Sequence, residues 1–265
     1  MSKAIQQQKS YKILLIGEIC KDVYVFGTVN RLNPEAPVPI LKKIRKDYKH
    51  GMSGNVFKNI QNMIGDNSRI SFHSNNHEDI KKIRFIDKKS NYQIMRYDIE
   101  KEVEQLTFEE IEKIDYDVIV ISDYNKGFLN SVLIERLVDT FKNSKIFVDT
   151  KRKDLSIFKN CVLKVNEREF SESHSCPGSS ELVITMGDKG CNYNGRNYAT
   201  KKVDVHDVCG AGDVFLAALV TRWLETKDMD ASIKIANNCA ALSVTKLGCY
   251  TISRKEYEDF VNSGN

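Results

Sequence analysis

The residues best suited to chemistry in this sequence surround the predicted start of a helix, in the segment Asp207-Val208-Cys209-Gly210-Ala211-Gly212-Asp213. Two glycines one residue apart let the backbone approach a ligand closely, and the free N–H groups and dipole of a helix start attract an anion. With the two acids, this arrangement favours phosphoryl transfer. We interpret Gly210, Ala211 and Gly212 as anion-binding amides and Asp213 as the acid that accepts a hydroxyl proton. The alternative for Asp213 is a carboxylate that only stabilises the helix dipole.

Other phosphate-binding and metal-binding motifs are absent from the sequence. A dinucleotide-binding fingerprint would need a third glycine where Phe215 stands, and it would follow the first strand. No P-loop motif occurs. The five histidines show no HxxxH or HxH spacing, and the seven cysteines form no CxxC pair. We therefore expect neither a histidine-based metal site, nor a zinc site, nor a disulfide framework.

Hydrophobic patterning predicts strands and helices that alternate along most of the chain. Continuous apolar runs predict buried strands, and apolar residues at helical spacing predict helices. The predicted strands span 12–17, 118–122, 146–149, 162–165 and 182–186, with a short hairpin at 192–198. The predicted helices span 54–64, 107–114 and 130–141, with further helices from Gly210, from Asp230 and after Ser253. This rhythm predicts an α/β fold with a mainly parallel central sheet flanked by helices.

Two strand pairs interrupt this rhythm and predict a small β lid outside the core. The first lies within 22–45, where β-branched and aromatic residues lead into a proline-rich loop. The second lies within 82–99, where side chains alternate around a polar turn. The expected organisation is a single domain over residues 1–265 that carries this lid.

Composition and charge fit an ordinary globular protein. The 265 residues are 41% hydrophobic and 29% charged, and the net charge of +4 is spread along the chain. No apolar run approaches the roughly 20 residues that cross a bilayer, and the N-terminal residues lack a secretory signal. We therefore expect a cytoplasmic protein that binds neither nucleic acid nor membrane. Small anionic substrates are compatible with this charge.

The segment 207–213 resembles the D-x-x-G-A-G-D signature of the ribokinase-type (PfkB) carbohydrate kinases, and the resemblance extends over nearly the whole chain. Within this family the chain is most similar to the kinases of D-glycero-β-D-manno-heptose 7-phosphate. That similarity is carried by the R-x-x-P-E-A-P-V-P stretch 31–39 and by the segments 122–127, 148–151 and 246–248. It implies a ribokinase-like fold and a kinase that uses ATP and Mg²⁺ to phosphorylate the anomeric hydroxyl of heptose 7-phosphate, giving the 1,7-bisphosphate.

The resemblance also assigns roles around the phosphates. It implies that Asp213 is the base and that the amides of residues 210–212 stabilise the transition-state charge. Asn166-x-x-Glu169 resembles the N-x-x-E motif that arranges magnesium, water and phosphates, and its alternative is a strand end followed by an exposed helical turn. The residues implied to contact the nucleotide are Asn166, Glu167, Arg168, Glu169, Thr185, Gly187, Lys189, Gly190 and Asp207.

For the sugar, the resemblance implies that Asp22 and Asn55 bind hydroxyl groups, with Gly54 in the same turn as Asn55. A turn-forming Asp and a helix-capping Asn are the structural alternatives. The phosphate already on the substrate needs cationic partners, since guanidinium and ammonium groups are its usual ligands. The candidates, each with a solvated surface charge as its alternative, are Arg31, Arg84, Arg96, Lys126 and Lys151.

The sequence departs from the family pattern at several points. Met52 replaces the second glycine of the turn before the first helix, Cys209 replaces a hydroxyl residue of the signature, and the segments 65–82 and 170–181 are short. Two other functions stay open: a kinase of another sugar, of the fructose or ribose type, and a catalytically weak sensor of sugar or nucleotide. The resemblance also leaves open a monovalent cation and a homodimer formed through the lid.

Overall fold

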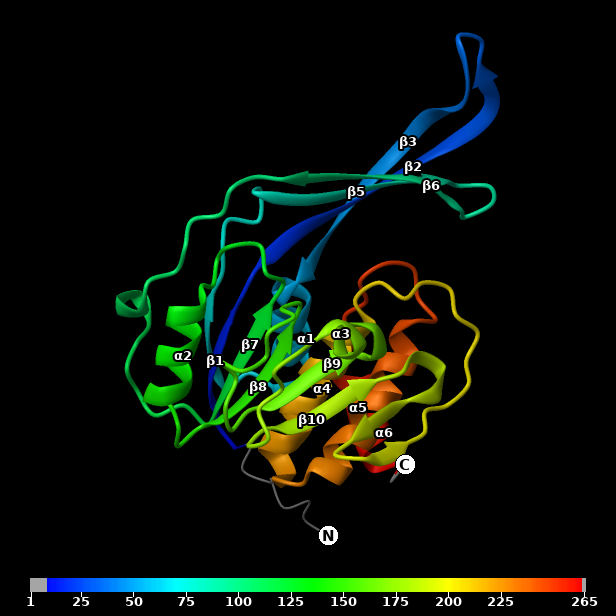
Figure 1. Ribbon diagram of the computed structural model, residues 1–265. Helices are drawn as coiled ribbons and strands as arrows, with labels where there is room; N and C mark the ends of the chain where they lie inside the picture. Colours follow the sequence, from blue (N-terminus) through cyan, green and yellow to red (C-terminus); the bar gives the residue numbers. More distant parts are fainter. Residues whose placement is uncertain (1–8, 264–265) are drawn as a thin grey trace.

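The computed structural model describes residues 9–263, which form two β-sheets (Figure 1). The larger sheet has the strand order β12-β11-β10-β9-β8-β7-β1-β4. Its strands are β1 (Lys12–Gly17), β4 (Arg69–His73), β7 (Val118–Asp123), β8 (Lys145–Thr150), β9 (Val162–Asn166), β10 (Glu181–Thr185), β11 (Cys191–Tyr193) and β12 (Arg196–Tyr198). The strands from β4 to β10 in this order pair in parallel, whereas β11 and β12 are antiparallel. The predicted mainly parallel sheet is therefore present.

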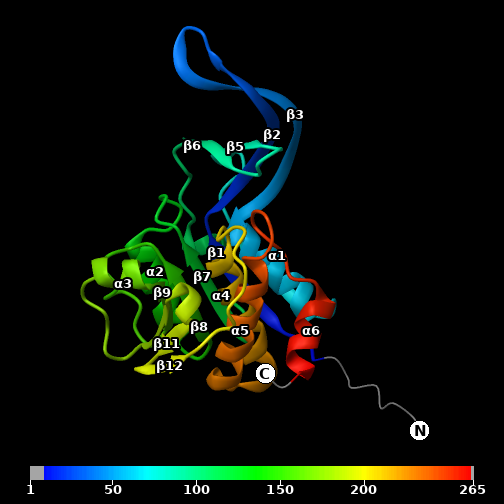
Figure 2. The ribbon, with the colours of Figure 1, turned by 90° about the vertical axis from the view of Figure 1, so that its right-hand side faces the viewer.

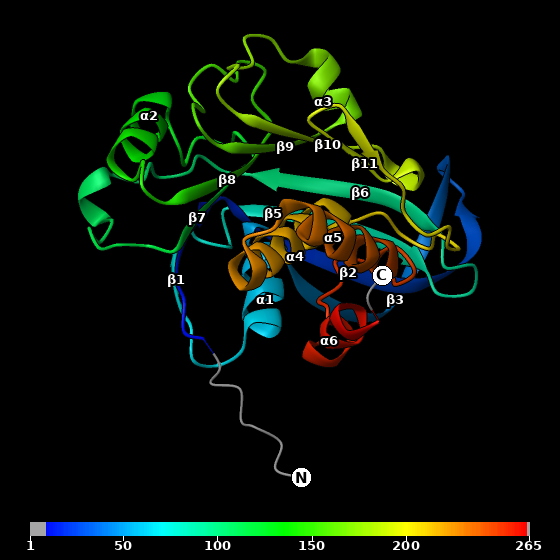
Figure 3. The ribbon, with the colours of Figure 1, turned by 90° about the horizontal axis from the view of Figure 1, so that it is seen from below.

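Each central strand sends alternate side chains into two hydrophobic cores, one on each face of the larger sheet. In β1, Ile13 and Leu15 enter one core, whereas Leu14 and Ile16 enter the other. Helices cover both faces (Figure 3). The first core contains α1 (Ser53–Ile64), α4 (Ala211–Thr226), α5 (Met229–Ser243) and α6 (Arg254–Asn262), and the second contains α2 (Ser131–Thr140). This two-sided burial explains why the strands are continuous apolar runs.

The smaller sheet, with the order β3-β2-β5-β6, projects from the body of the molecule as a lid (Figure 2). Its strands are β2 (Ile19–Asn33), β3 (Ala36–Met52), β5 (Ile80–Asp87) and β6 (Gln93–Glu100). These strands extend past the expected limits of 22–45 and 82–99. Because β2 follows β1 and β3 runs directly into α1, the lid is continuous with elements of the central body.

The predicted helix at 107–114 is wrong. The segment forms a single 3-10 turn, η1 (Phe108–Glu110), although the capping box of Thr107 and Glu110 is present. The chain here leads from Glu100, at the lid, back to β7, which begins beside β1 at the opposite end of the sheet. Val103, Leu106, Phe108 and Ile111 of this segment are instead buried in the second core. Packing against that core therefore overrides the local helix signal.

The two short segments contain little helix, as their lengths indicate. β4 leads to β5 through residues 74–79 without a helix. After α3 (Glu167–Glu172), the chain makes an isolated bridge between Asp154 and His174 and then enters β10. Within residues 9–263, no helix is both long and apolar enough to cross a membrane.

Candidate active site

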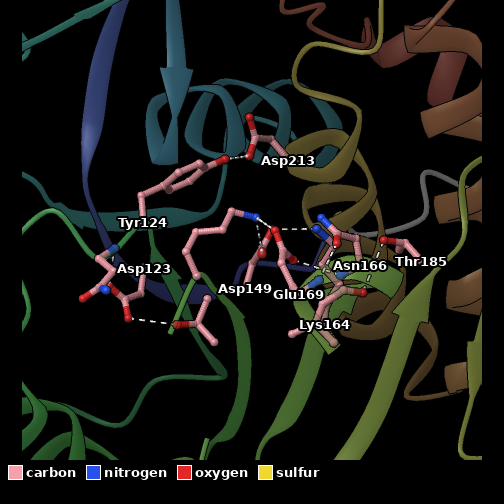
Figure 4. A network of polar contacts seen from close by, with 12 residues as sticks. Asp123, Tyr124, Asp149, Lys164, Asn166, Glu169, Thr185 and Asp213 are labelled. Carbon is pink, nitrogen blue, oxygen red and sulfur yellow. Dashed lines mark hydrogen bonds and ion pairs between the residues drawn. The ribbon is translucent and has the colours of Figure 1, made fainter. Parts of the chain in front are cut away.

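Asp213 lies in the first turn of α4, which begins near the carboxyl ends of the central strands. Its side chain is only 3% exposed. The Tyr124 hydroxyl donates to Asp213 Oδ1 at 2.5 Å (Figure 4), and the Asn55 amide donates to Oδ2 at 3.2 Å. Burial raises the pKa of Asp213 to about 6, and the two hydrogen bonds limit that rise. The carboxylate is therefore ionised at pH 7 but basic enough to accept a proton.

Gly210 allows α1 and α4 to meet at this point. It has φ 76°, and a Cβ added there would lie 2.5 Å from Asn55 Nδ2 and 3.2 Å from Cys249 Sγ. Asn55 Nδ2 also donates to the Gly210 carbonyl at 3.3 Å. The glycine turn therefore places Asn55 directly beside Asp213.

Lys164 on β9 brings an ammonium group to the same turn. A Cβ added to Gly212 would lie 2.8 Å from Lys164 Nζ, which donates to Asp149 Oδ2 at 2.7 Å. Both members of this ion pair are buried. Burial opposes ionisation of Asp149, but Lys164 and Lys151 outweigh it and lower the pKa of this carboxyl. The sequence analysis missed Lys164, whose one signal is a lysine within the apolar run 162–165.

A cavity of about 210 Å³ lies between these groups. It is lined by Tyr124, Asp149, Lys151, Lys164, Asn166, Thr185, Gly210, Gly212 and Asp213. Among the described residues, Asp149 Oδ1 is buried without a hydrogen-bond partner, and Lys151 Nζ lies 3.6 Å from it. A base, two ammonium groups and the glycine turn thus surround a space that suits a transferred phosphoryl group.

Asn166 and Glu169 cap α3 reciprocally. Asn166 Oδ1 accepts from the Glu169 N–H (2.8 Å), and Glu169 Oε2 accepts from the Asn166 N–H (2.9 Å). Glu169 also forms an ion pair with Lys151 (Figure 4). Asn166 lines the cavity directly, whereas Glu169 is joined to it through Lys151. Asn166 and Glu169 therefore cap a helical turn, as the structural alternative expects. Asn166 also lines the cavity, as a phosphate site would require.

A groove of about 460 Å³ adjoins the glycine turn. The predicted nucleotide residues Thr185, Gly187 and Gly190 line it, together with Gly212. The sequence analysis missed its apolar wall, formed by Val203, Val205, Val208, Phe215, Ala240, Ala241 and Val244. An apolar groove that opens beside an anion site suits a nucleotide, because the base has apolar faces and the phosphates are anionic.

Besides Asn166 and Glu169, four other predicted nucleotide residues lie outside this groove. Glu167 and Arg168 line a separate, open hollow, and the exposed Lys189 lies 3.9 Å from Glu167. Asp207 accepts hydrogen bonds from two backbone N–H groups, those of Cys209 (2.9 Å) and the residue at 248 (2.8 Å). Asp207 therefore joins the loop before α4 to the loop after α5. This structural role accounts for an acid at this position of the signature without any contact to a ligand.

Asp22 and Arg84, both predicted to bind substrate, instead form a buried ion pair with each other. Cys249 Sγ donates to the second oxygen of Asp22 at 3.2 Å. Arg84 Nη2 lies 3.5 Å from Cys209 Sγ, so the pair sits beside the signature segment. Arg84 is therefore not a free cation, and both carboxylate oxygens of Asp22 have partners.

Gly54 and Met52 shape the start of α1. A Cβ added to Gly54 would lie 2.6 Å from Ile19 Cδ1, so this glycine permits close packing of α1 against β2. Met52 is buried and has φ 59°, a conformation that costs a residue with a side chain more than it costs glycine. Met52 thus holds a positive-φ backbone at the start of α1 that glycine adopts without a steric cost.

The other predicted cations of the lid region differ in their surroundings. Arg31 is exposed near the outer end of β2. Arg96 pairs with Asp98 (2.9 Å), and Lys126 pairs with Glu100 (2.7 Å). Both of these ion pairs are substantially exposed to solvent.

Lys82 is a further lid cation that the sequence analysis did not single out. It shares a face of β5 with Arg84, and its Nζ lies 5.7 Å from the centroid of the Tyr124 ring. Within the part of the chain that the structure describes, no carboxylate lies within ion-pair distance of Lys82. The alternating side chains of 82–86 could have identified Lys82 from the sequence, because they place it on the same face of the strand as the predicted Arg84.

Comparisons with known proteins show which families this chain resembles. Residues 162–256 match the family described as pfkB family carbohydrate kinase. The chain is similar to the bifunctional protein HldE of Hydrogenovibrio crunogenus, at 28% identity over 95% of this chain and 63% of the relative. It is also similar to HldE of Pasteurella multocida, at 26% identity over 96% of this chain and 64% of the relative. The chain thus spans less than two thirds of the length of these relatives.

Solved structures show the same fold. Ribokinase from Thermotoga maritima matches with a TM-score of 0.70 and 18% identity, over 95% of this chain and 99% of that one. Phosphofructokinase-2 from Escherichia coli, in complex with potassium, matches with a TM-score of 0.74 and 13% identity, over 97% of this chain and 100% of that one. These likenesses confirm the predicted ribokinase-like fold.

Proposed function

We propose that this chain, whose residues 162–256 match the pfkB carbohydrate kinase family, phosphorylates the anomeric hydroxyl of D-glycero-D-manno-heptose 7-phosphate with ATP, giving the 1,7-bisphosphate. The observation that carries phosphoryl transfer is the buried, basic Asp213 beside the turn 210–212. The similarity to HldE proteins and the stretch 31–39 support a heptose phosphate as the acceptor.

In the proposed reaction, Asp213 accepts the proton of the acceptor hydroxyl as its oxygen bonds to the γ-phosphorus of ATP. The bond between that phosphorus and the bridging oxygen breaks, and ADP leaves with the electron pair. The turn 210–212 and the ammonium group of Lys164 stand beside the cavity in which this charge develops. One such donor is typically worth about 3 kcal/mol.

The residues around the cavity fit Mg²⁺. Asp149 Oδ1 is a buried carboxylate oxygen without a hydrogen-bond partner among the described residues, although Lys151 Nζ lies 3.6 Å from it, and Asn166 lines the same space. Mg²⁺ is usually held by one or two carboxylates together with phosphates and waters. We propose that Asp149 binds the ion, with Asn166 and Glu169 acting through water. Mg²⁺ held there would neutralise charge on the phosphates.

We expect Glu169→Gln to raise the Mg²⁺ concentration needed for half-maximal activity. The amide retains an oxygen that can cap α3 but removes the charge that pairs with Lys151. The freed ammonium group then competes with the ion for the phosphates. A Mg²⁺ titration at fixed ATP measures the effect, with Glu135→Gln, at an exposed position on α2, as the control. An unchanged titration in Glu169→Gln would count against the assignment.

A monovalent cation and a homodimer are further proposals. The similar phosphofructokinase-2 structure contains potassium, which supports testing a monovalent ion here. The lid exposes large apolar side chains, and such patches mark interaction surfaces. They are Leu32, Val38, Ile44, Tyr48, Tyr92, Met95 and Tyr97. We propose that these side chains pair two lids in a homodimer.

The lid also offers cations for the phosphate of the substrate. Exposed ion pairs contribute only about 0.2–1 kcal/mol, so Arg96 and Lys126 can exchange their carboxylates for a phosphate at little cost. Arg84 cannot do so without leaving Asp22 charged and buried. Lys82 has no ion pair to break among the described residues. We therefore propose it as the principal phosphate ligand of the lid.

We expect Lys82→Met to lower kcat/KM for heptose 7-phosphate about 10- to 100-fold, because a hydrogen bond to a charged group contributes about 1.5–3 kcal/mol. The KM for ATP and the activity on unphosphorylated heptose should change by less than about threefold. Initial rates on both sugars at saturating ATP measure this difference. Lys81→Met is the matched control, since Lys81 is the next residue on the opposite face of β5 and pairs with Glu78 (2.7 Å).

The same assay separates the alternative functions. One outcome is a parent enzyme that prefers a neutral sugar and a Lys82→Met variant whose ratio of rates on phosphorylated and neutral sugar is unchanged. That pair of results would favour a kinase of the fructose or ribose type. A parent that binds ATP and sugar but transfers no phosphoryl group would favour the sensor. Either result would overturn the heptose 7-phosphate assignment.

A further inference from the structure

We propose that Tyr124 is a positioning residue whose hydroxyl orients the carboxylate of Asp213 toward the acceptor. The inference rests on the proposed role of Asp213 as the base. Tyr124 donates to Oδ1 at 2.5 Å (Figure 4), and Asn55 donates to Oδ2 at 3.2 Å. With one donor on each oxygen, the carboxylate cannot rotate without losing a charge-assisted hydrogen bond. Because a carboxylate oxygen accepts more than one hydrogen bond, the acceptor hydroxyl can bind while both donors remain.

The segment that carries Tyr124 is itself firmly held. Glu18 is fully buried and accepts from the N–H groups of Tyr124 (2.8 Å) and Lys126 (3.0 Å). Asp123 is also fully buried and accepts from the N–H of the residue that follows Tyr124 (2.9 Å) and from Arg152 Nε (2.5 Å). Buried carboxylates are costly unless they are bonded. Two of them fix this short segment, which gives the phenol a defined place.

Two ammonium groups lie near the ring of Tyr124, one from the lid and one from the central body. Lys82 Nζ of the lid lies 5.7 Å from the ring centroid, and Lys151 Nζ of the central body lies 5.3 Å from it. Tyr124 also lines the cavity that contains Asp213. Its hydroxyl therefore joins the base to the part of the site where lid and body meet.

Several groups besides Tyr124 act on the charge of Asp213. They are Asp149, Lys151 and Lys164 from the strands and the loop after β8, Asn55 from α1, and the thiols of Cys20 and Cys249. Of the described residues, Tyr124 and Asn55 are the ones that hydrogen-bond to the carboxylate. Removal of the phenol hydroxyl thus removes one of two direct donors and leaves the surrounding charges unchanged.

The experiment compares Tyr124→Phe with the parent in a pH profile of kcat/KM at saturating Mg²⁺ and ATP. Loss of a donor disfavours the ionised carboxylate, so the acid limb should move about one unit above the parent's limb. Activity should then fall about tenfold relative to the parent below that limb, and the difference should shrink above pH 8. Tyr116→Phe is the matched control, because it removes the hydroxyl of another buried tyrosine, one that donates to a backbone carbonyl away from the site.

The outcomes are distinct. An acid limb that moves upward in Tyr124→Phe but not in Tyr116→Phe supports the inference, provided that ATP binding is retained. A loss of activity by the same factor at every pH, with an unmoved limb, would show a merely structural role and overturn it. A parent without phosphoryl transfer would overturn the proposed function itself, and the inference with it.

Discussion

Replacing Asp213 by Asn should lower kcat by about 10³-fold while leaving the affinity for ATP nearly intact. General base catalysis contributes about 10²–10⁴-fold, and an amide of the same shape cannot accept the acceptor proton. Single-turnover rates and ATP titrations measure the two effects separately. Asp139→Asn provides a matched control, since it makes the same change at an exposed position on α2.

The same variant should also change the pH dependence of stability. The pKa of Asp213 in the folded chain, about 6, lies above the ordinary value of 3.8. Such a carboxyl destabilises the folded state above its folded pKa and costs nothing when both states are protonated. Asp213→Asn should therefore raise the free energy of unfolding above that of the parent, and this gain should be larger at pH 8 than at pH 4. Asp139→Asn should show no such difference between the two pH values.

Activity of Asp213→Asn within about threefold of the parent would remove Asp213 as the base.

Local signals explain why the position of Asp213 at a helix start, beside a glycine turn, could be predicted from sequence. The glycines at 210 and 212 and the acid at 213 lie within one helical turn, so their juxtaposition depends on the helix alone. The central strands could also be predicted from sequence, because burial on both faces leaves continuous apolar runs. The prediction of a helix at 107–114 failed because packing of that segment against the second core, which no local pattern encodes, decides its backbone.

The partners of charged side chains could not be predicted, because they depend on contacts distant in sequence. Asp22 and Arg84 are 62 positions apart and meet only through the parallel pairing of β2 with β5. Tyr124 reaches Asp213 over 89 positions. A sequence shows which cations are available near the lid, but the sheet register decides which of them a carboxylate has already neutralised.

That distinction leads to a second large effect, on stability. We expect Arg84→Met to lower the free energy of unfolding by about 3–5 kcal/mol, because removal of one member of a buried ion pair leaves the other charge uncompensated. Asp22 would then keep the thiol of Cys249 as its remaining close donor. For a chain of this size the loss corresponds to a fall in Tm of roughly 10 °C. Thermal unfolding measures it directly.

Two further variants make this prediction specific to the buried pair. Arg96→Met removes the arginine that faces Arg84 across β5 and β6 but breaks only an exposed pair, so it should cost about 1 kcal/mol or less. The double variant Asp22→Asn with Arg84→Met removes the stranded charge and should recover most of the lost stability. If Arg84→Met and Arg96→Met unfold at the same temperature, Asp22 is not held by Arg84 in solution. Arg84 would then again be available to a substrate phosphate, and its removal should lower kcat/KM for the phosphorylated sugar as strongly as removal of Lys82.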